Sequence, residues 1–104
     1  MHDMTEQDIQ RQITDYLKLK RIFHRKVNIA GIMKPNGGYI PSQNAGMSDI
    51  IGCLWGGRFL AIEVKKKGGK VSPLQQAFLD EVNANGGLGF VAYSLDDVIK
   101  MLDN

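Results

Sequence analysis

The sequence predicts a small α/β fold whose elements follow the order α-β-β-β-α-β-α, and three observations support this prediction. Apolar residues recur at helical spacing over residues 5–20, as one face of an amphipathic helix requires. Two apolar runs, 49–55 and 58–65, are separated by a pair of glycines in the manner of a β-hairpin. A serine–proline pair then opens a helix, and the apolar run 88–93 that follows it is typical of a buried strand.

The other elements follow from weaker patterns. Alternating apolar residues predict a strand over residues 22–33, with Gly31 as a bulge or as its end. Residues 34–48 are rich in Pro, Gly, Asn and Ser and predict a long loop, which in a compact domain is usually functional or disordered. Ser94 begins the last helix as its N-cap. The helix after Ser72 is expected to place four apolar residues on one face: Leu74, Ala77, Phe78 and Val82.

Length and composition indicate one globular domain over residues 1–104. A hydrophobic content of 43% argues against disorder. Cys53 is the only cysteine, which excludes an internal disulfide and a Cys-based zinc cluster and favours a reducing compartment. We expect Cys53 to be a small core residue. Because the N-terminal residues lack a signal-peptide pattern and no apolar stretch is long enough to span a bilayer, we expect a soluble, cytoplasmic protein.

Positive charge is concentrated in two segments although the net charge is only +2. Such clusters suit a polyanionic partner, because lysine and arginine bind phosphates without regard to base sequence. On charge alone, two solvated surface patches remain the simpler interpretation. The first cluster consists of Lys18, Lys20, Arg21, Arg25 and Lys26, and the second of Lys65, Lys66, Lys67 and Lys70.

The strongest local signal for chemistry is the segment Ile62-Glu63-Val64-Lys65. Side chains two apart in a strand share a face, so Glu63 and Lys65 point the same way. A charged pair on an otherwise apolar strand is costly to bury without a purpose. By itself the pattern also fits a strand whose charged end emerges into solvent.

Asp49 strengthens the signal if the hairpin brings it beside Glu63. A two-residue turn at Gly56-Gly57 pairs Asp49 with Val64 and places the two acids on opposite faces. A three-residue loop, 55–57, pairs Asp49 with Glu63, and glycine readily adopts the left-handed conformation that such a loop requires. We therefore expect a loop of odd length or a bulge.

Two adjacent carboxylates repel each other unless a cation lies between them. Oxygen ligands suit Mg²⁺ or Mn²⁺, which retain several waters and also bind phosphate oxygens. A nearby lysine is able to orient or help deprotonate a water, or to stabilise the charge of a phosphate. Asp49, Glu63 and Lys65 together therefore indicate hydrolysis of a phosphodiester.

An ordered set of motifs resembles the virus-type replication-repair nuclease (VRR-NUC) domain of the PD-(D/E)XK superfamily. The motifs are Gly46-x-x-Asp49-Ile50, then Glu63-Val64-Lys65, a Gly-rich turn and Ser72-x-x-Gln75. The resemblance implies a restriction-endonuclease-like α/β core, with a mixed sheet flanked by helices. It also implies a divalent metal held by Asp49, Glu63 and the Val64 carbonyl, with Lys65 serving the attacking water. Ser48 stands where the superfamily's name has proline.

The resemblance assigns catalytic roles to two further residues, and each has a structural alternative. Glu6 matches the acid of the family's first helix and extends the inward-facing stripe, but an acid in a first turn also complements the helix dipole. Gln75 matches a glutamine that would contact the scissile phosphate or a metal-bound water. With Ser72 it also forms a capping box. We do not expect one side chain to make both bonds at once.

These observations favour a structure-selective DNA endonuclease, because the sequence has no evident recognition helix or zinc finger. Minimal members of the family resemble junction-resolving enzymes. A four-way junction has two-fold symmetry, so the matching assembly is a homodimer. Two alternatives stay open: a DNA-binding accessory module without catalysis, and a nuclease subunit of a restriction or RNA-processing system. The residues do not distinguish DNA from RNA.

Overall fold

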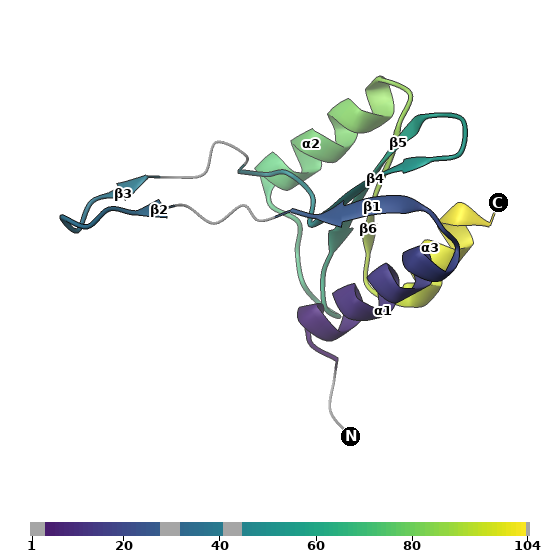
Figure 1. The fold of residues 1–104 in the computed structure, drawn as a ribbon, viewed down its shortest axis with the longest axis horizontal. Helices are drawn as coiled ribbons and strands as arrows, with labels where there is room; N and C mark the ends of the chain where they lie inside the picture. The colour runs from purple at the N-terminus through teal and green to yellow at the C-terminus, as the bar shows by residue number, and fades with distance from the viewer. Residues whose placement is uncertain (1–3, 28–31, 41–44, 104) are drawn as a thin grey trace.

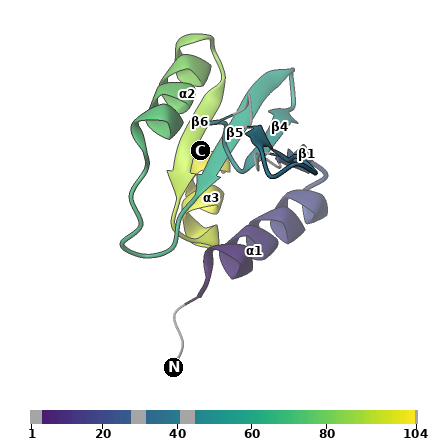
Figure 2. The same cartoon turned by 90° about the vertical axis from the view of Figure 1, so that its left-hand side faces the viewer.

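The computed structural model describes residues 4–27, 32–40 and 45–103 of the chain. Its main sheet has four strands in the order β1-β4-β5-β6, with α1 and α3 on one face and α2 on the other (Figures 1 and 2). The elements are α1 (Glu6–Leu19), β1 (Phe23–Lys26), β2 (Ile32–Met33), β3 (Tyr39–Ile40), β4 (Ile50–Leu54), β5 (Arg58–Val64), α2 (Pro73–Ala84), β6 (Leu88–Ala92) and α3 (Leu95–Leu102).

The sheet is mixed, as the sequence resemblance implied. Strands β1, β4 and β5 pair in antiparallel fashion, whereas β5 and β6 are parallel and are joined by α2. A parallel pair needs such a crossover, and a helix is its usual form. The α/β fold class is therefore confirmed. None of the helices in the described residues is long and apolar enough to cross a membrane.

The main hydrophobic core lies between the sheet and the pair α1 and α3. Helix α1 buries Ile9, Ile13 and Leu17, whose spacing of four residues places them on one face. They pack with alternate residues of the strands, among them Ile50 and Ile62, and with residues of β6 and α3. Because successive strand residues face opposite ways, the intervening side chains point to the α2 face of the sheet.

The turn between β4 and β5 has three residues, which confirms the expected odd-length loop. Leu54 pairs with Arg58, and Ile50 pairs with Ile62. Gly56 and Gly57 both have left-handed backbone conformations, with φ values of 88° and 87°. Extended by one residue, this register sets Asp49 opposite Glu63.

The expected single strand over residues 22–33 is wrong. Strand β1 ends at Lys26, and Ile32–Met33 belong to a separate hairpin with β3, which falls inside the expected loop. Pairing of β1 with the main sheet ends where β4 begins, with a last bond from the Val27 N–H to the Asp49 carbonyl at 2.8 Å. The expected bulge or end at Gly31 lies outside the described residues.

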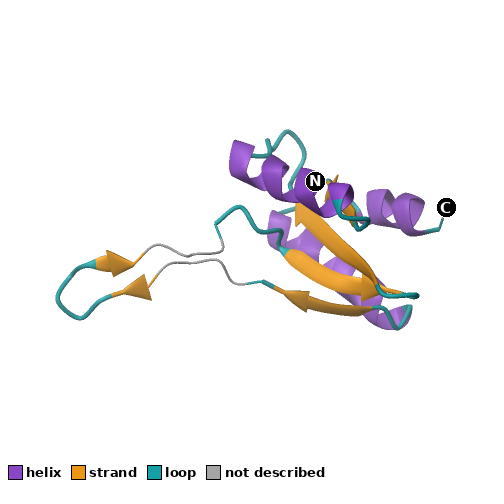
Figure 3. Cartoon of the chain, turned by 90° about the horizontal axis from the view of Figure 1, so that it is seen from above, coloured by secondary structure: helices purple, strands orange, loops and turns teal. Residues whose placement is uncertain are grey.

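The hairpin of β2 and β3 stands apart from the main sheet in Figures 1 and 3. Its turn is closed by a bond from the Lys34 N–H to the Gly38 carbonyl, at 2.6 Å. Gly37 has a left-handed conformation there (φ 88°). The Asn-Gly-Gly sequence is itself a hairpin signal, but the polar composition around it favoured a loop.

Helix α2 is rotated relative to the expected orientation. Leu79 is its most buried residue, whereas Leu74 is 62% exposed and Ala77 is also exposed. Helix α2 packs on β5 and β6, and its backbone does not approach that of β4 in the described structure. For this reason the α2 face of β1 and β4 is uncovered, and Cys53 is exposed there rather than in the core.

Candidate active site

Asp49 and Glu63 lie opposite each other on the face of the sheet that carries α2. Asp49 comes directly before β4, and Glu63 is the penultimate residue of β5. Glu63 is only 1% exposed, while Asp49 is half-buried. The Asp49 Oδ2 accepts a hydrogen bond from the Val64 N–H at 2.8 Å, which ties this carboxylate to the end of β5. The two acids predicted from the sequence are therefore brought together.

Glu63 has a buried carboxylate that its neighbours satisfy only in part. Its Oε1 accepts a hydrogen bond from Gln75 Nε2 at 3.0 Å and lies 3.8 Å from Lys65 Nζ. Its Oε2 is buried and has no hydrogen-bond partner in the described structure. An ionised oxygen in that position is costly unless a proton or a cation reaches it.

The electrostatics of the site favour the neutral form of Glu63 when no cation is present. Burial is the largest cause, followed by the negative charge of the facing Asp49. These effects outweigh the Lys65 ammonium and raise the pKa of Glu63 to about 8. Lys65, itself only 15% exposed, thus offsets part of the repulsion and not all of it.

Gln75 bonds to the cap of its own helix and to Glu63 at the same time. Its Oε1 accepts from the Ser72 N–H at 2.9 Å, and the Ser72 Oγ accepts from the Gln75 N–H at 3.2 Å, so the capping box is complete. Its Nε2 donates to Glu63 at the same time. The two bonds are compatible because an amide carries an acceptor and a donor on different atoms, so the cap leaves the Gln75 Nε2 available to the site.

The segment that leads to Asp49 packs against the same end of α2. Gly46 has a φ of 88°, and a Cβ at this position would lie 2.8 Å from the Leu74 carbonyl oxygen. Only glycine fits this contact without moving backbone. Ser48 follows, fully buried, and its Oγ has no hydrogen-bond partner among the described residues. Sequence reasoning noted Ser48 only as a departure from proline and did not predict its burial.

Glu6, the first residue of α1, lies at the margin of the site. Its Oε2 accepts a long hydrogen bond from the Lys66 N–H at 3.5 Å, and its charge contributes to the raised pKa of Glu63. The capping box of α1 is instead made by Thr5 and Asp8, a pair that the sequence analysis missed although both residue types are typical of caps. A hollow of about 390 Å³ adjoins Glu6 and is also lined by Lys66 and Lys67.

The side chains offer a cation two carboxylates and not three. Among the described residues, no group of three His, Cys, Asp or Glu side chains is gathered closely enough to hold a metal ion. Asp49 and the unpartnered Oε2 of Glu63 are oxygen donors of the kind that hard divalent cations prefer. The donor set therefore fits a cation that completes its coordination with backbone oxygen and water.

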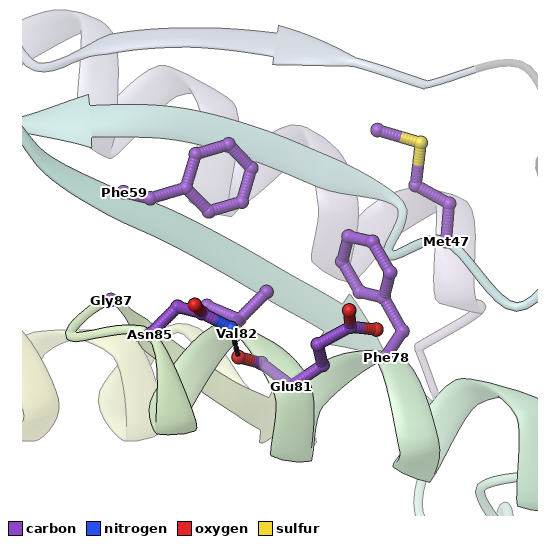
Figure 4. A pocket seen from close by; sticks show the side chains of 7 residues that line it. All are labelled: Met47, Phe59, Phe78, Glu81, Val82, Asn85 and Gly87. Atoms are coloured by element: carbon purple, nitrogen blue, oxygen red, sulfur yellow. Dashed lines mark hydrogen bonds between the residues drawn. The ribbon is translucent and has the colours of Figure 1, made fainter.

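A second hollow on the α2 face has a different character. It measures about 340 Å³ and lies between α2 and Phe59 of β5, with Phe78 and Met47 also facing it (Figure 4). Of the seven described residues that line it, Glu81 alone is ionisable. This apolar hollow therefore lacks the paired acids and the lysine found at the end of β5.

A mixed α/β sheet with paired acids and a lysine at one end defines a nuclease-superfamily core. The chain belongs to the VRR-NUC domain family, whose model matches residues 4–96. A solved structure described as a VRR_NUC domain protein has the same fold, with a TM-score of 0.71 and 23% sequence identity. That similarity covers 98% of this chain and 88% of the other. No curated protein matches the chain.

The raised pKa of Glu63 predicts how stability depends on pH in metal-free solution. Between about pH 4.5 and about pH 8 the folded protein holds a proton on Glu63 that the unfolded chain has released. The free energy of unfolding therefore falls as pH rises through this window, by at most about 1.4 kcal/mol per pH unit. Urea unfolding of Glu63→Gln should lack this component, whereas Glu81→Gln, which changes an exposed carboxyl group, should retain it. A wild-type stability that is flat over the window would contradict the assignment.

The two bonds of Gln75 are separable by mutation. Ser72→Ala removes the cap and should lower the free energy of unfolding by about 1 kcal/mol. Gln75→Glu keeps an acceptor for the Ser72 N–H but replaces the donor to Glu63 with a third acid, which should raise the pKa of Glu63 further. NMR titration of the Glu63 carboxyl carbon measures this shift. An unchanged Glu63 titration in Gln75→Glu would show that the Gln75–Glu63 bond is not made in solution.

Proposed function

We propose that the chain is a metal-dependent DNA endonuclease, with residues 1–104 acting as one nuclease domain. The observation that carries the proposal is the Glu63 carboxylate, buried beside Asp49 with one oxygen left without a partner. In the proposed site, Asp49, Glu63 and the Val64 carbonyl hold Mg²⁺ or Mn²⁺. Such an ion supplies Lewis acidity and lowers the pKa of water.

The protein's own residues have distinct roles in this proposal. The Lys65 Nζ lies 3.8 Å from a carboxylate oxygen of Glu63. In the proposed role its ammonium stabilises the negative charge of the phosphate or orients the attacking water. Gln75 bonds to Glu63 through its amide group, and we assign it the contact to the scissile phosphate or to a metal-bound water. Glu6 holds the start of the lysine run beside the site through the Lys66 N–H. Lys66 and Lys67 attract the DNA backbone.

The proposed substrate is branched DNA, a four-way junction in particular, in the cytoplasm. A junction has two-fold symmetry, so two cuts at equivalent positions require two copies of the site related by a two-fold axis. The chain is small and buries a modest core, which gives an independent reason to expect a homodimer. Recognition in this scheme rests on backbone phosphates and shape, and not on base edges.

Cleavage assays test the proposal directly. We expect wild-type protein to cut a four-way junction at symmetric positions with Mg²⁺ or Mn²⁺ and not in EDTA, in preference to linear duplex and single strands. Asp49→Asn and Glu63→Gln should each lose more than about 100-fold in rate, since even outer-shell losses at metal sites cost roughly 10–100-fold. Glu81→Gln serves as the control, with the same loss of an acid outside the site. DNA binding should survive in all three variants, because cations supply most of it.

Each of the remaining outcomes bears on one part of the proposal. Near wild-type cleavage by Asp49→Asn or Glu63→Gln would contradict the proposed metal site. Binding in EDTA without cleavage in any metal would support an accessory module, and cleavage of RNA alone would move the site to an RNA-processing role. A monomer by light scattering that still makes both junction cuts at once would contradict the symmetric dimer.

A further inference from the structure

A basic hollow lies along the outer edge of the sheet, away from the paired acids. It measures about 480 Å³ and is formed where the end of α1 meets the edge strand β1. Three of its lining residues are cations, and none of the six described residues that line it is an aspartate or a glutamate. The lining residues are Lys18, Arg21, Ile22, Phe23, His24 and Arg25. We call the cations Lys18, Arg21 and Arg25 the edge cluster.

We propose that the edge cluster binds phosphates of the nucleic-acid substrate at a position separate from the bond that is cut. The inference rests on the proposed nuclease function and adds a second contact surface to it. Of the five cations in the basic segment around β1, only the three that line this hollow belong to the proposed contact surface. Lys20 lies instead over the ring of Tyr16, at 5.7 Å from its centroid.

Arg25 is held in place before any ligand arrives. Its guanidinium carbon lies 4.6 Å from the centre of the Phe23 ring, and its Nη1 donates to the His24 carbonyl at 2.7 Å. Phe23 is 60% exposed, so this stacked pair faces solvent. An arginine whose plane is already fixed loses less conformational entropy when its remaining N–H groups bind a phosphate.

Arg21 occupies a position at which glycine would be less strained. It follows α1 with a φ of 58°, and within the described residues it is the one non-glycine with a left-handed backbone. The N–H of Arg21 donates to the Lys18 carbonyl and that of Ile22 to the Leu17 carbonyl, a helix end that usually carries glycine. Arginine in this conformation is less stable than glycine would be, and glycine would make the same backbone hydrogen bonds. The strain therefore accompanies the charged side chain and not the helix end.

The sheet register places Arg25 of the edge cluster on the same face as the paired acids. Phe23 pairs with Cys53 and Arg25 with Ile51, so both point to the face that carries Asp49. Helix α2 does not cover this part of the sheet. Counted along β4 at about 3.3 Å per residue, the pair lies roughly 7–13 Å beyond Asp49, which corresponds to about two to four base-pair steps of 3.4 Å.

Charge argues against a second copy of the chain as the occupant of this hollow. In a two-fold interface centred on this hollow, the three cations of one copy would face those of the other. Like charges brought together in this way repel each other. A chain of phosphates is the complementary partner.

Salt-dependent DNA binding tests the proposal. The probe is a fluorescein-labelled four-way junction in EDTA, with a 20-base-pair duplex as a second probe, and the affinity is measured over a range of NaCl concentrations. Arg21→Gly and Arg25→Gln should each bind more weakly and flatten the slope of log K against log[salt] by up to about 0.9, the value for one phosphate contact. Arg21→Gly should melt at or above the wild-type temperature, so that misfolding does not explain its loss. Lys100→Gln on α3 is the control for an equal change in net charge.

The outcomes separate this inference from the proposed function. Wild-type protein that binds and cuts, with wild-type slopes in both arginine variants, would overturn the edge cluster alone. Slopes flattened equally by Lys100→Gln would also overturn it, because the effect would then belong to net charge. Conversion of a dimer to a monomer by either arginine variant would assign the hollow to contact between copies. Wild-type protein that neither binds nor cuts any nucleic acid would overturn both proposals.

Discussion

The three-residue turn between β4 and β5 is the constraint on which the site depends. With Leu54 paired to Arg58, the register carries Asp49 to a position opposite Glu63. A turn shorter by one residue would send the two acids to opposite faces of the sheet, and no adjustment of side chains would restore the pair. Gly56 and Gly57 adopt the left-handed conformations that this turn requires. The backbone conformation of this turn thus determines which residues face each other at the other end of the same two strands.

The first turn of α2 holds the two halves of the site together. Gln75 bonds to Glu63 with one end of its amide and to the cap of its own helix with the other. The Leu74 backbone contacts Gly46, on the segment that leads to Asp49. Burial of Glu63 beside the half-buried Asp49 has an energetic cost in the absence of a cation, and the same two effects raise the pKa of Glu63. Rigid neighbours maintain the arrangement despite it, as is common at functional sites.

Features set by local pattern were predictable from the sequence, whereas those set by packing were not. Hydrophobic period and glycine position predicted the two hairpin strands and the odd-length turn that sets the register at Asp49, and the serines predicted the helix starts at Ser72 and Ser94 but not the Thr5 cap of α1. The predicted orientation of α2 was wrong, because the polar Gln75 turns inward to reach Glu63 while the apolar Leu74 remains exposed. The hairpin of β2 and β3 was hidden by its polar composition. The stacking of Arg25 on Phe23 depends on which face of β1 is left uncovered, and a sequence pattern does not specify that.

Thermal unfolding with and without Mg²⁺ tests the central claim, that Asp49 and Glu63 form one cation site, without any substrate. Asp49→Asn keeps an oxygen for the Val64 N–H, so the metal-free variant should be at least as stable as wild type because it loses a repulsive charge. A cation that binds only the folded protein stabilises it by about 2.7 kcal/mol at 100 times its dissociation constant. We predict this gain in wild type and its near-complete loss in Asp49→Asn. An equal Mg²⁺ shift in both proteins would place the ion elsewhere and contradict the account.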